Sequence, residues 1–184
     1  MGDTLTTMIA IFISAILMFI FPLMSISERS DDITQLGIQT ATVDFVDKIR
    51  STGKITEEDY DSFISTLNAT GNSFDVNMEV KVLDENPGKK TQWAVKDKIG
   101  ENIYYSVYDT QIKDELFSKN GNGSGQYLLK EGDIVSVSVK NTNKTISQLL
   151  RNAFYKISGD DTYQVAAQHS GMVMSNGTTT NGIK

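Results

Sequence analysis

The first part of the chain is apolar on every side. Asp3 is the only charged residue before Glu28, so residues 4–27 form an uncharged window of 24 residues. As a helix this window is about 36 Å long, enough to cross a bilayer core of about 30 Å. A helix of a soluble core normally keeps a polar stripe, whereas Ser14 is the only polar residue within 8–24. The pattern predicts an N-terminal transmembrane anchor.

A cleaved signal peptide is the alternative interpretation of this segment. Ser25 and Ser27 form a weak small-residue cleavage pattern, but a signal peptide also needs a basic n-region, and the first basic residue is Arg29. The length of the apolar run favours retention in the cell membrane. Anchors with so short a head usually place the following body outside, so we expect a single-pass protein with an extracellular C-terminal domain.

Apolar residues beyond the membrane recur at helical spacing. The stripe advances in steps of three and seven residues and consists of Ile33, Leu36, Val43, Val46 and Ile49. It predicts an amphipathic helix that continues the membrane helix and packs against the rest of the body. Gly53 is expected to end this helix. Pro22 is expected to bend it near the outer membrane face, because proline removes a backbone donor.

Two further helices are predicted in the body. The first covers 56–68, with Thr56 as its cap, and its apolar face is Tyr60, Phe63, Ile64 and Leu67. The second covers 145–157, and its expected core face is Ile146, Leu149, Leu150, Phe154 and Ile157. A shorter helix is predicted over 112–117.

The strands are predicted from alternation. Residues 74–82 alternate with period two, and their buried side is Phe74, Val76, Met78, Val80 and Val82. In 134–139, Val135, Val137 and Val139 are expected on one face and Ile134, Ser136 and Ser138 on the other. This segment is expected to form a hairpin with 126–129. Further strands are predicted at 92–96, 103–108 and 163–174, with a turn at 86–88.

The fold class is therefore α+β, with a mostly antiparallel sheet and a long N-terminal helix. The 184 residues suffice for one domain and an anchor. The predicted organisation is a transmembrane anchor at 1–27, an amphipathic helical spine at 28–53, an extracytoplasmic α+β domain at 54–176 and a flexible tail at 177–184.

Composition excludes several classes of partner. Without Asp3, the chain has 22 acidic residues against 17 basic ones, so the body has a net charge of −5. Nucleic-acid binding needs a net basic face, and so does a polybasic contact with the membrane surface. The chain has no cysteine, which excludes disulfides, cysteine-ligated metals and a thiol nucleophile.

One loop partly matches a calcium-binding pattern. Positions 1, 3, 5, 6 and 12 of an EF-hand-like loop are filled by Asn120, Asn122, Ser124, Gly125 and Glu131. The first position lacks its usual aspartate, and the loop leads into a strand pattern rather than a helix. A Gly/Asn-rich connecting loop explains the composition better than a calcium site.

Other polar residues have similarly ordinary explanations. His169 and Ser170 are neighbours in a predicted strand, so their side chains are expected on opposite faces and cannot pair directly. Three acidic pairs are explained by capping and solvation next to turns or helix starts, namely Asp31–Asp32, Asp84–Glu85 and Asp160–Asp161. Trp93, Tyr104, Tyr105 and Tyr108 are expected on sheet faces or, if exposed, in a protein interface.

We therefore expect no catalytic, cofactor-binding or metal-binding residues, no cofactor and no small-molecule substrate. The chain is expected not to be an enzyme.

Three stretches of the body carry a family resemblance: TGKITEEDYDSF at 52–63, ATGNSFDV at 69–76 and LKEGDIVSVSVKN at 129–141. Together with the charge-free helix and Pro22, they resemble type IV pilin-like proteins, particularly those of Tad-type pilus machinery in Gram-positive bacteria. Such proteins usually carry a glutamate five residues into the mature chain. If cleavage follows Gly2, Thr7 stands there, and the resemblance then favours a minor pilin-like subunit.

The resemblance implies a structural subunit of a cell-surface pilus or secretion-type filament. Its partners would be membrane lipid and self or related pilin-like subunits, contacted through the N-terminal helix. Ala10, Ser14 and Ala15 are small enough to permit close helix approach. The alternative is a membrane-tethered extracellular binding or sensing domain that does not assemble.

Overall fold

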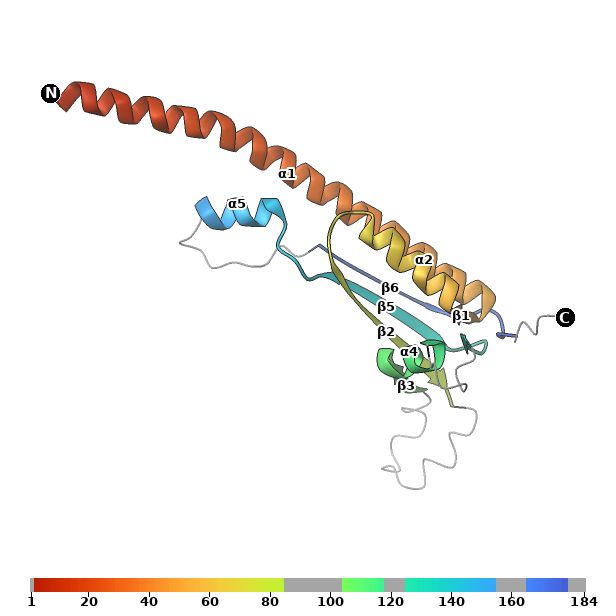
Figure 1. The fold of residues 1–184 in the computed structure, drawn as a ribbon. Helices are drawn as coiled ribbons and strands as arrows, with labels where there is room; N and C mark the ends of the chain where they lie inside the picture. Colours follow the sequence, from red (N-terminus) through yellow and green to blue (C-terminus); the bar gives the residue numbers. More distant parts are fainter. Residues whose placement is uncertain (1, 85–103, 118–124, 155–164, 179–184) are drawn as a thin grey trace, which may run out of the picture.

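The computed structural model describes residues 2–84, 104–117, 125–154 and 165–178. Its fold is α+β: a long N-terminal helix lies along two antiparallel sheets, with further helices beside them (Figure 1). The helices are α1 (Gly2–Thr52), α2 (Glu57–Asn68), α4 (Asp109–Phe117) and α5 (Ile146–Phe154). The strands are β1 (Lys54–Thr56), β2 (Phe74–Leu83), β3 (Tyr104–Tyr108), β4 (Gln126–Leu128), β5 (Ile134–Asn141) and β6 (Ala166–Met172). The predicted turn at 86–88 and strand at 92–96 lie outside the described residues.

Helix α1 joins the apolar segment to the body without a break. It passes through Pro22, and Figure 1 shows a gentle curve between its two halves. The helix is thus curved but not interrupted. It ends one residue before Gly53, as predicted, and Gly53 has a φ of 68° that favours glycine. A Cβ at Gly53 would also lie 2.1 Å from the carbonyl oxygen of Ser175, so the C-terminal segment needs this glycine.

The main sheet has four antiparallel strands in the order β3-β2-β5-β6. One face is apolar, because the alternation in β2 and β5 places Val76, Met78, Val80, Val135, Val137 and Val139 there. The other face is polar, as is common for an antiparallel sheet with one solvated side. On that face Ser106 donates a hydrogen bond to Glu79 at 2.7 Å, and Ser170 donates one to Ser136 at 2.7 Å.

The core lies between the apolar sheet face and the helices. Side chains from α1, α2 and α4 meet there, including Ile49, Phe63 and Ile112. The predicted apolar face of α2 is confirmed, with Tyr60, Phe63 and Leu67 buried. Its cap is also confirmed: the amide of Asp59 donates to the Thr56 hydroxyl at 3.1 Å.

The predicted hairpin of 126–129 with 134–139 is wrong. β4 pairs with β1 in a separate two-stranded sheet, and β5 pairs with β2 and β6. A tight turn does separate the two segments: the buried carboxylate of Asp133 accepts from the amides of Lys130 and Leu83 at 2.8 and 2.9 Å. The bond to Leu83 fixes this turn to the end of β2, so the strand after it joins the main sheet.

Two predicted helix faces also need correction. On α1, Ile33 and Leu36 point to solvent, while the packing face is made by Thr34, Ile38, Thr42, Phe45, Val46 and Ile49. On α5, Ile146 and Leu149 are exposed and not in the core. The described part of this helix is Ile146–Phe154, and Ile157 lies outside the described residues.

Candidate membrane and assembly helix

The first half of α1 is long and apolar enough to cross a bilayer. None of its most apolar stretch is buried within the molecule, which distinguishes it from a core helix of a soluble domain. Figure 1 shows this half extending beyond the sheets, so its side chains are free to contact lipid or other helices. This geometry is compatible with single-pass membrane anchoring.

An exposed apolar stripe runs along α1 from this half into the body. It recurs every seven residues and consists of Leu5, Phe12, Phe19, Ile26 and Ile33. Residues seven apart lie along one side of a helix, with a drift of about 20° per repeat. Ile33 is 66% exposed and the neighbouring Leu36 is 65% exposed. Both lie beyond the uncharged window, about 9–14 Å past its last residue.

Ala10, Ser14 and Ala15 are also exposed in the first half of the helix. Ala10 and Ser14 are four residues apart and therefore share one side. At about 100° per residue, that side lies away from the stripe of large apolar residues. The structure places these small residues where another helix has access to them.

Polar residues of α1 are buried at the point where the helix meets the body. Ser27, Asp31 and Thr34 are buried there although they lie within the helix. The hydroxyl of Thr145 donates a hydrogen bond to Asp31 at 2.8 Å, and this bond attaches the start of α5 to α1. The expectation that Asp31 and Asp32 sit at a turn or helix start is wrong, because both lie within α1.

Side chains of α1 also cover the outer edge of β6. Gln35 donates to the carbonyl of Ala166 at 2.6 Å and accepts from its amide at 3.0 Å. Arg50 donates to the carbonyl of Met172 at 3.0 Å. Exposed strand edges invite pairing with other chains. These contacts occupy backbone groups at both ends of β6.

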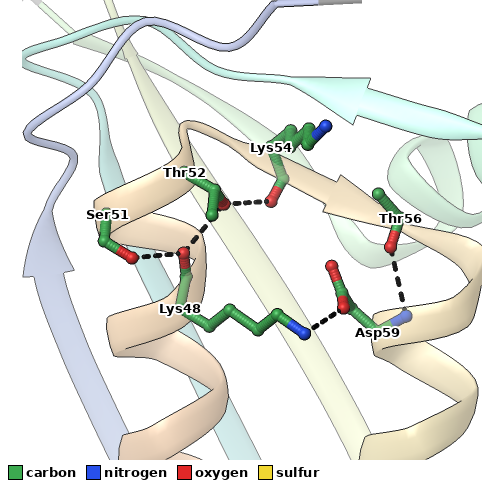
Figure 2. Close-up of polar contacts among 6 residues, drawn as sticks. All are labelled: Lys48, Ser51, Thr52, Lys54, Thr56 and Asp59. Carbon is green, nitrogen blue, oxygen red and sulfur yellow. Dashed lines mark hydrogen bonds and ion pairs between the residues drawn. The ribbon is translucent and has the colours of Figure 1, made fainter. Parts of the chain in front are cut away.

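Helices α1 and α2 are joined by an aromatic stack and an ion pair. The rings of Phe45 and Phe63 stack with centroids 4.4 Å apart. At the ends of the helices, Lys48 Nζ lies 2.5 Å from a carboxylate oxygen of Asp59, and Figure 2 shows this pair beside the Thr56 cap. Burial raises the pKa of Asp59, but hydrogen bonds from Lys48 and Thr56 outweigh it, so the pKa is below its ordinary value of 3.8.

Acid is expected to weaken the junction between α1 and α2 through Asp59. Because the pKa of Asp59 is lower in the folded state, its stabilisation is present above the unfolded value of 3.8 and is lost as pH falls through the folded value. Asp59→Asn should therefore reduce the loss of unfolding free energy on acidification. Denaturant titrations of the full chain in detergent, repeated at several pH values, measure this. The control is Asp61→Asn on the exposed side of α2, and equal acid slopes for the two variants would refute the expectation.

The remaining candidate residues do not form a shared site. His169 faces α1, with Nε2 3.8 Å from Asp47, whereas Ser170 bonds to Ser136 on the polar sheet face. Their predicted separation is thus confirmed. Among the residues that the structure describes, no group of three or more His, Asp or Glu could hold a metal ion. Most of the loop with the calcium-like pattern, including Asn120, Asn122 and Ser124, lies outside them, as do Trp93, Glu85, Asp160 and Asp161.

The two described tyrosines with the largest exposure lie on the edge strand β3. Tyr105 is about half exposed and Tyr108 more so, and Tyr104 is partly buried. For aromatic residues of this segment that are exposed, the sequence predicts a protein interface, and Tyr105 and Tyr108 are exposed. They lie at the opposite edge of the sheet from β6.

Comparisons of the chain with protein-family models, with curated protein sequences and with solved structures find no match. The class of protein is therefore defined by its own architecture. It is an α+β protein whose long N-terminal helix contains one candidate membrane span and continues as the support of an antiparallel sheet.

Proposed function

We propose that this chain is a membrane-anchored, pilin-like structural subunit of a cell-surface pilus or secretion-type filament. The sheet domain would be extracellular, and the N-terminal helix would pass from lipid into contact with helices of self or related subunits. The observation that supports this proposal is the continuation of the exposed apolar stripe beyond the membrane segment to Ile33, with the exposed Leu36 beside it.

An anchor alone does not require these two residues to be apolar. Their side chains would lie outside the bilayer core and in water, on a helix whose opposite side is already packed on the sheet. Burying one such side chain stabilises a contact by about 1.5–3 kcal/mol. A neighbouring helix that follows the stripe would cover the membrane half and this extension together.

Electron microscopy of sheared cell-surface material, combined with mass spectrometry, tests the proposal directly. The expected result is a filament fraction that contains this chain. Recovery of the chain only as a detergent-soluble monomer would contradict assembly and favour a membrane-tethered binding or sensing domain.

Replacing Ile33 and Leu36 together by aspartate is expected to remove the chain from the filament fraction. Both side chains are exposed, so the body should keep its unfolding free energy within about 0.5 kcal/mol. Two buried carboxylates between helices would be strongly unfavourable. The measurement is the ratio of chain in sheared material to chain in the membrane.

The matched control for this variant is Ser62→Asp with Ser65→Asp, which adds the same charges at the same spacing on the exposed side of α2. Assembly of the control at the wild-type level is expected. Equal loss of assembly in both variants would show that added charge, and not the stripe, is responsible.

A further inference from the structure

Two large aliphatic side chains in the first turn of α5 are exposed. Ile146 is 63% exposed and Leu149 is 54% exposed, whereas the polar residues Thr145 and Ser147 beside them are buried. The first turn of α5 therefore turns polar groups toward the molecule and two large aliphatic groups outward. This is the reverse of what a helix contributing to a soluble core does.

The position of α5 along α1 indicates what could cover this side. The uncharged window of α1 ends at Ser27, and the hydrogen bond from Thr145 attaches the start of α5 to Asp31. Asp31 is four residues, or about 6 Å, beyond that end. From there α5 runs beside α1 back toward its N-terminal half (Figure 1), over a length of about 13 Å.

When α1 crosses a bilayer, α5 thus starts beyond the end of the uncharged window, and its first turn reaches the level of Ser27, where that window ends. The polar headgroup layer on each side is about 5–8 Å thick. Ile26, which is exposed on α1 at this level, continues the apolar surface of the membrane half. The segment Ile146–Phe154 has no acidic residue, so its own sequence carries no charge that anionic headgroups would repel.

We propose that the first turn of α5 lies at the outer interface of the membrane that α1 spans and inserts Ile146 and Leu149 there. These two side chains are therefore covered by lipid, at the boundary between headgroups and acyl chains, and not by another protein. The inference rests on the membrane anchoring in the proposed function but not on filament assembly.

A second contact with the bilayer would determine the orientation of the body. A single spanning helix can rotate about its axis and tilt. A helix held beside it by the bond between Thr145 and Asp31, with its own apolar side in the interface, restricts both motions. The polar face of the sheet would then keep a constant orientation relative to the membrane.

Single-cysteine labelling tests this inference, because the chain has no cysteine of its own. The full chain is reconstituted into vesicles of phosphatidylethanolamine and phosphatidylglycerol, with an environment-sensitive fluorophore at Leu149→Cys. The lipids carry a nitroxide quencher either near the top or near the end of the acyl chain. Phe12→Cys reports insertion of the anchor, and Ser65→Cys on exposed α2 reports water.

The expected result is a blue-shifted Leu149 label that loses most fluorescence with the shallow quencher, a Phe12 label quenched most by the deep one, and an unquenched Ser65 label. A label at Ile146→Cys should repeat the result for Leu149. If the Phe12 label is quenched and the α5 labels are not, the interfacial helix is refuted while the anchor stands. If the α5 labels shift to the blue without quenching by lipid, a protein covers α5 and the inference is equally refuted. If the Phe12 label is not quenched either, the anchoring in the proposed function fails and the inference fails with it.

Discussion

Replacement of Phe45 by alanine is expected to lower the free energy of unfolding of the body by about 3–5 kcal/mol, the usual cost of deleting a buried aromatic ring. Phe45 is 5% exposed and stacks on Phe63 across the contact of α1 with α2. A domain of this size has a total stability of about 5–15 kcal/mol. The single change therefore removes a large fraction of it. Denaturant unfolding of the full chain in detergent, followed by near-ultraviolet circular dichroism, measures the loss.

The matched control is Leu36→Ala, which shortens another large apolar residue of the same helix. Leu36 is exposed, so its removal should change the unfolding free energy by less than about 0.5 kcal/mol. A double-mutant cycle of Phe45 and Phe63 should give a coupling of about 0.5–1.5 kcal/mol from the stacked rings. Equal effects of Phe45→Ala and Leu36→Ala would show that α1 is not held on the body through this face.

The sequence predicts correctly those helix ends and strand faces that depend on residues only two or three positions apart. The alternation in β2 is strict, and one face of a strand repeats every second residue, so Val76, Met78 and Val80 were assigned correctly. Thr56 followed by Asp59 predicted the start of α2 because a cap acts over three residues. Gly53 predicted the end of α1 in the same way.

The packing face of α1 could not be read from its apolar residues. A step of three residues falls about 60° short of a full helical turn. The predicted stripe therefore drifts by about 200° between Ile33 and Ile49, from solvent to core. The true face begins with the polar residues Ser27, Asp31 and Thr34, whose partners come from distant parts of the chain. Only the structure shows that Thr145, 114 residues away, is the partner of Asp31.

The same limit applies to α5 and to the candidate site. An amphipathic pattern predicts that Ile146 and Leu149 share a side, but not whether that side meets a core, a protein or lipid. The uncharged window was evident from the sequence, and the structure agrees that a continuous exposed helix contains it. The extension of the exposed stripe to Ile33 contradicts the prediction that Ile33 packs against the body. Exact seven-residue spacing from Leu5 was the signal that could have shown it.

Lysine at both Phe12 and Ile16 is expected to release the chain from the membrane. The two positions lie near the middle of the uncharged window and four residues apart, so both charges occupy one side of the helix at the bilayer centre. Each lysine there opposes insertion by about 2.5–3.5 kcal/mol. The fraction of chain left in the membrane pellet after alkaline extraction measures the effect.

Loss from the pellet can be assigned to lipid because Phe12 and Ile16 are exposed, so the lysines remove no contact that holds the body together. Ser62→Lys with Thr66→Lys is the matched control, since it places the same charges at the same spacing on exposed α2. The control should remain in the pellet as the wild type does. Full retention of the variant with lysine at 12 and 16 would mean that these residues do not lie at the bilayer centre. Both proposals that depend on the anchor, assembly from the membrane and the interfacial position of α5, would then fail, whereas the fold of the body would be unaffected.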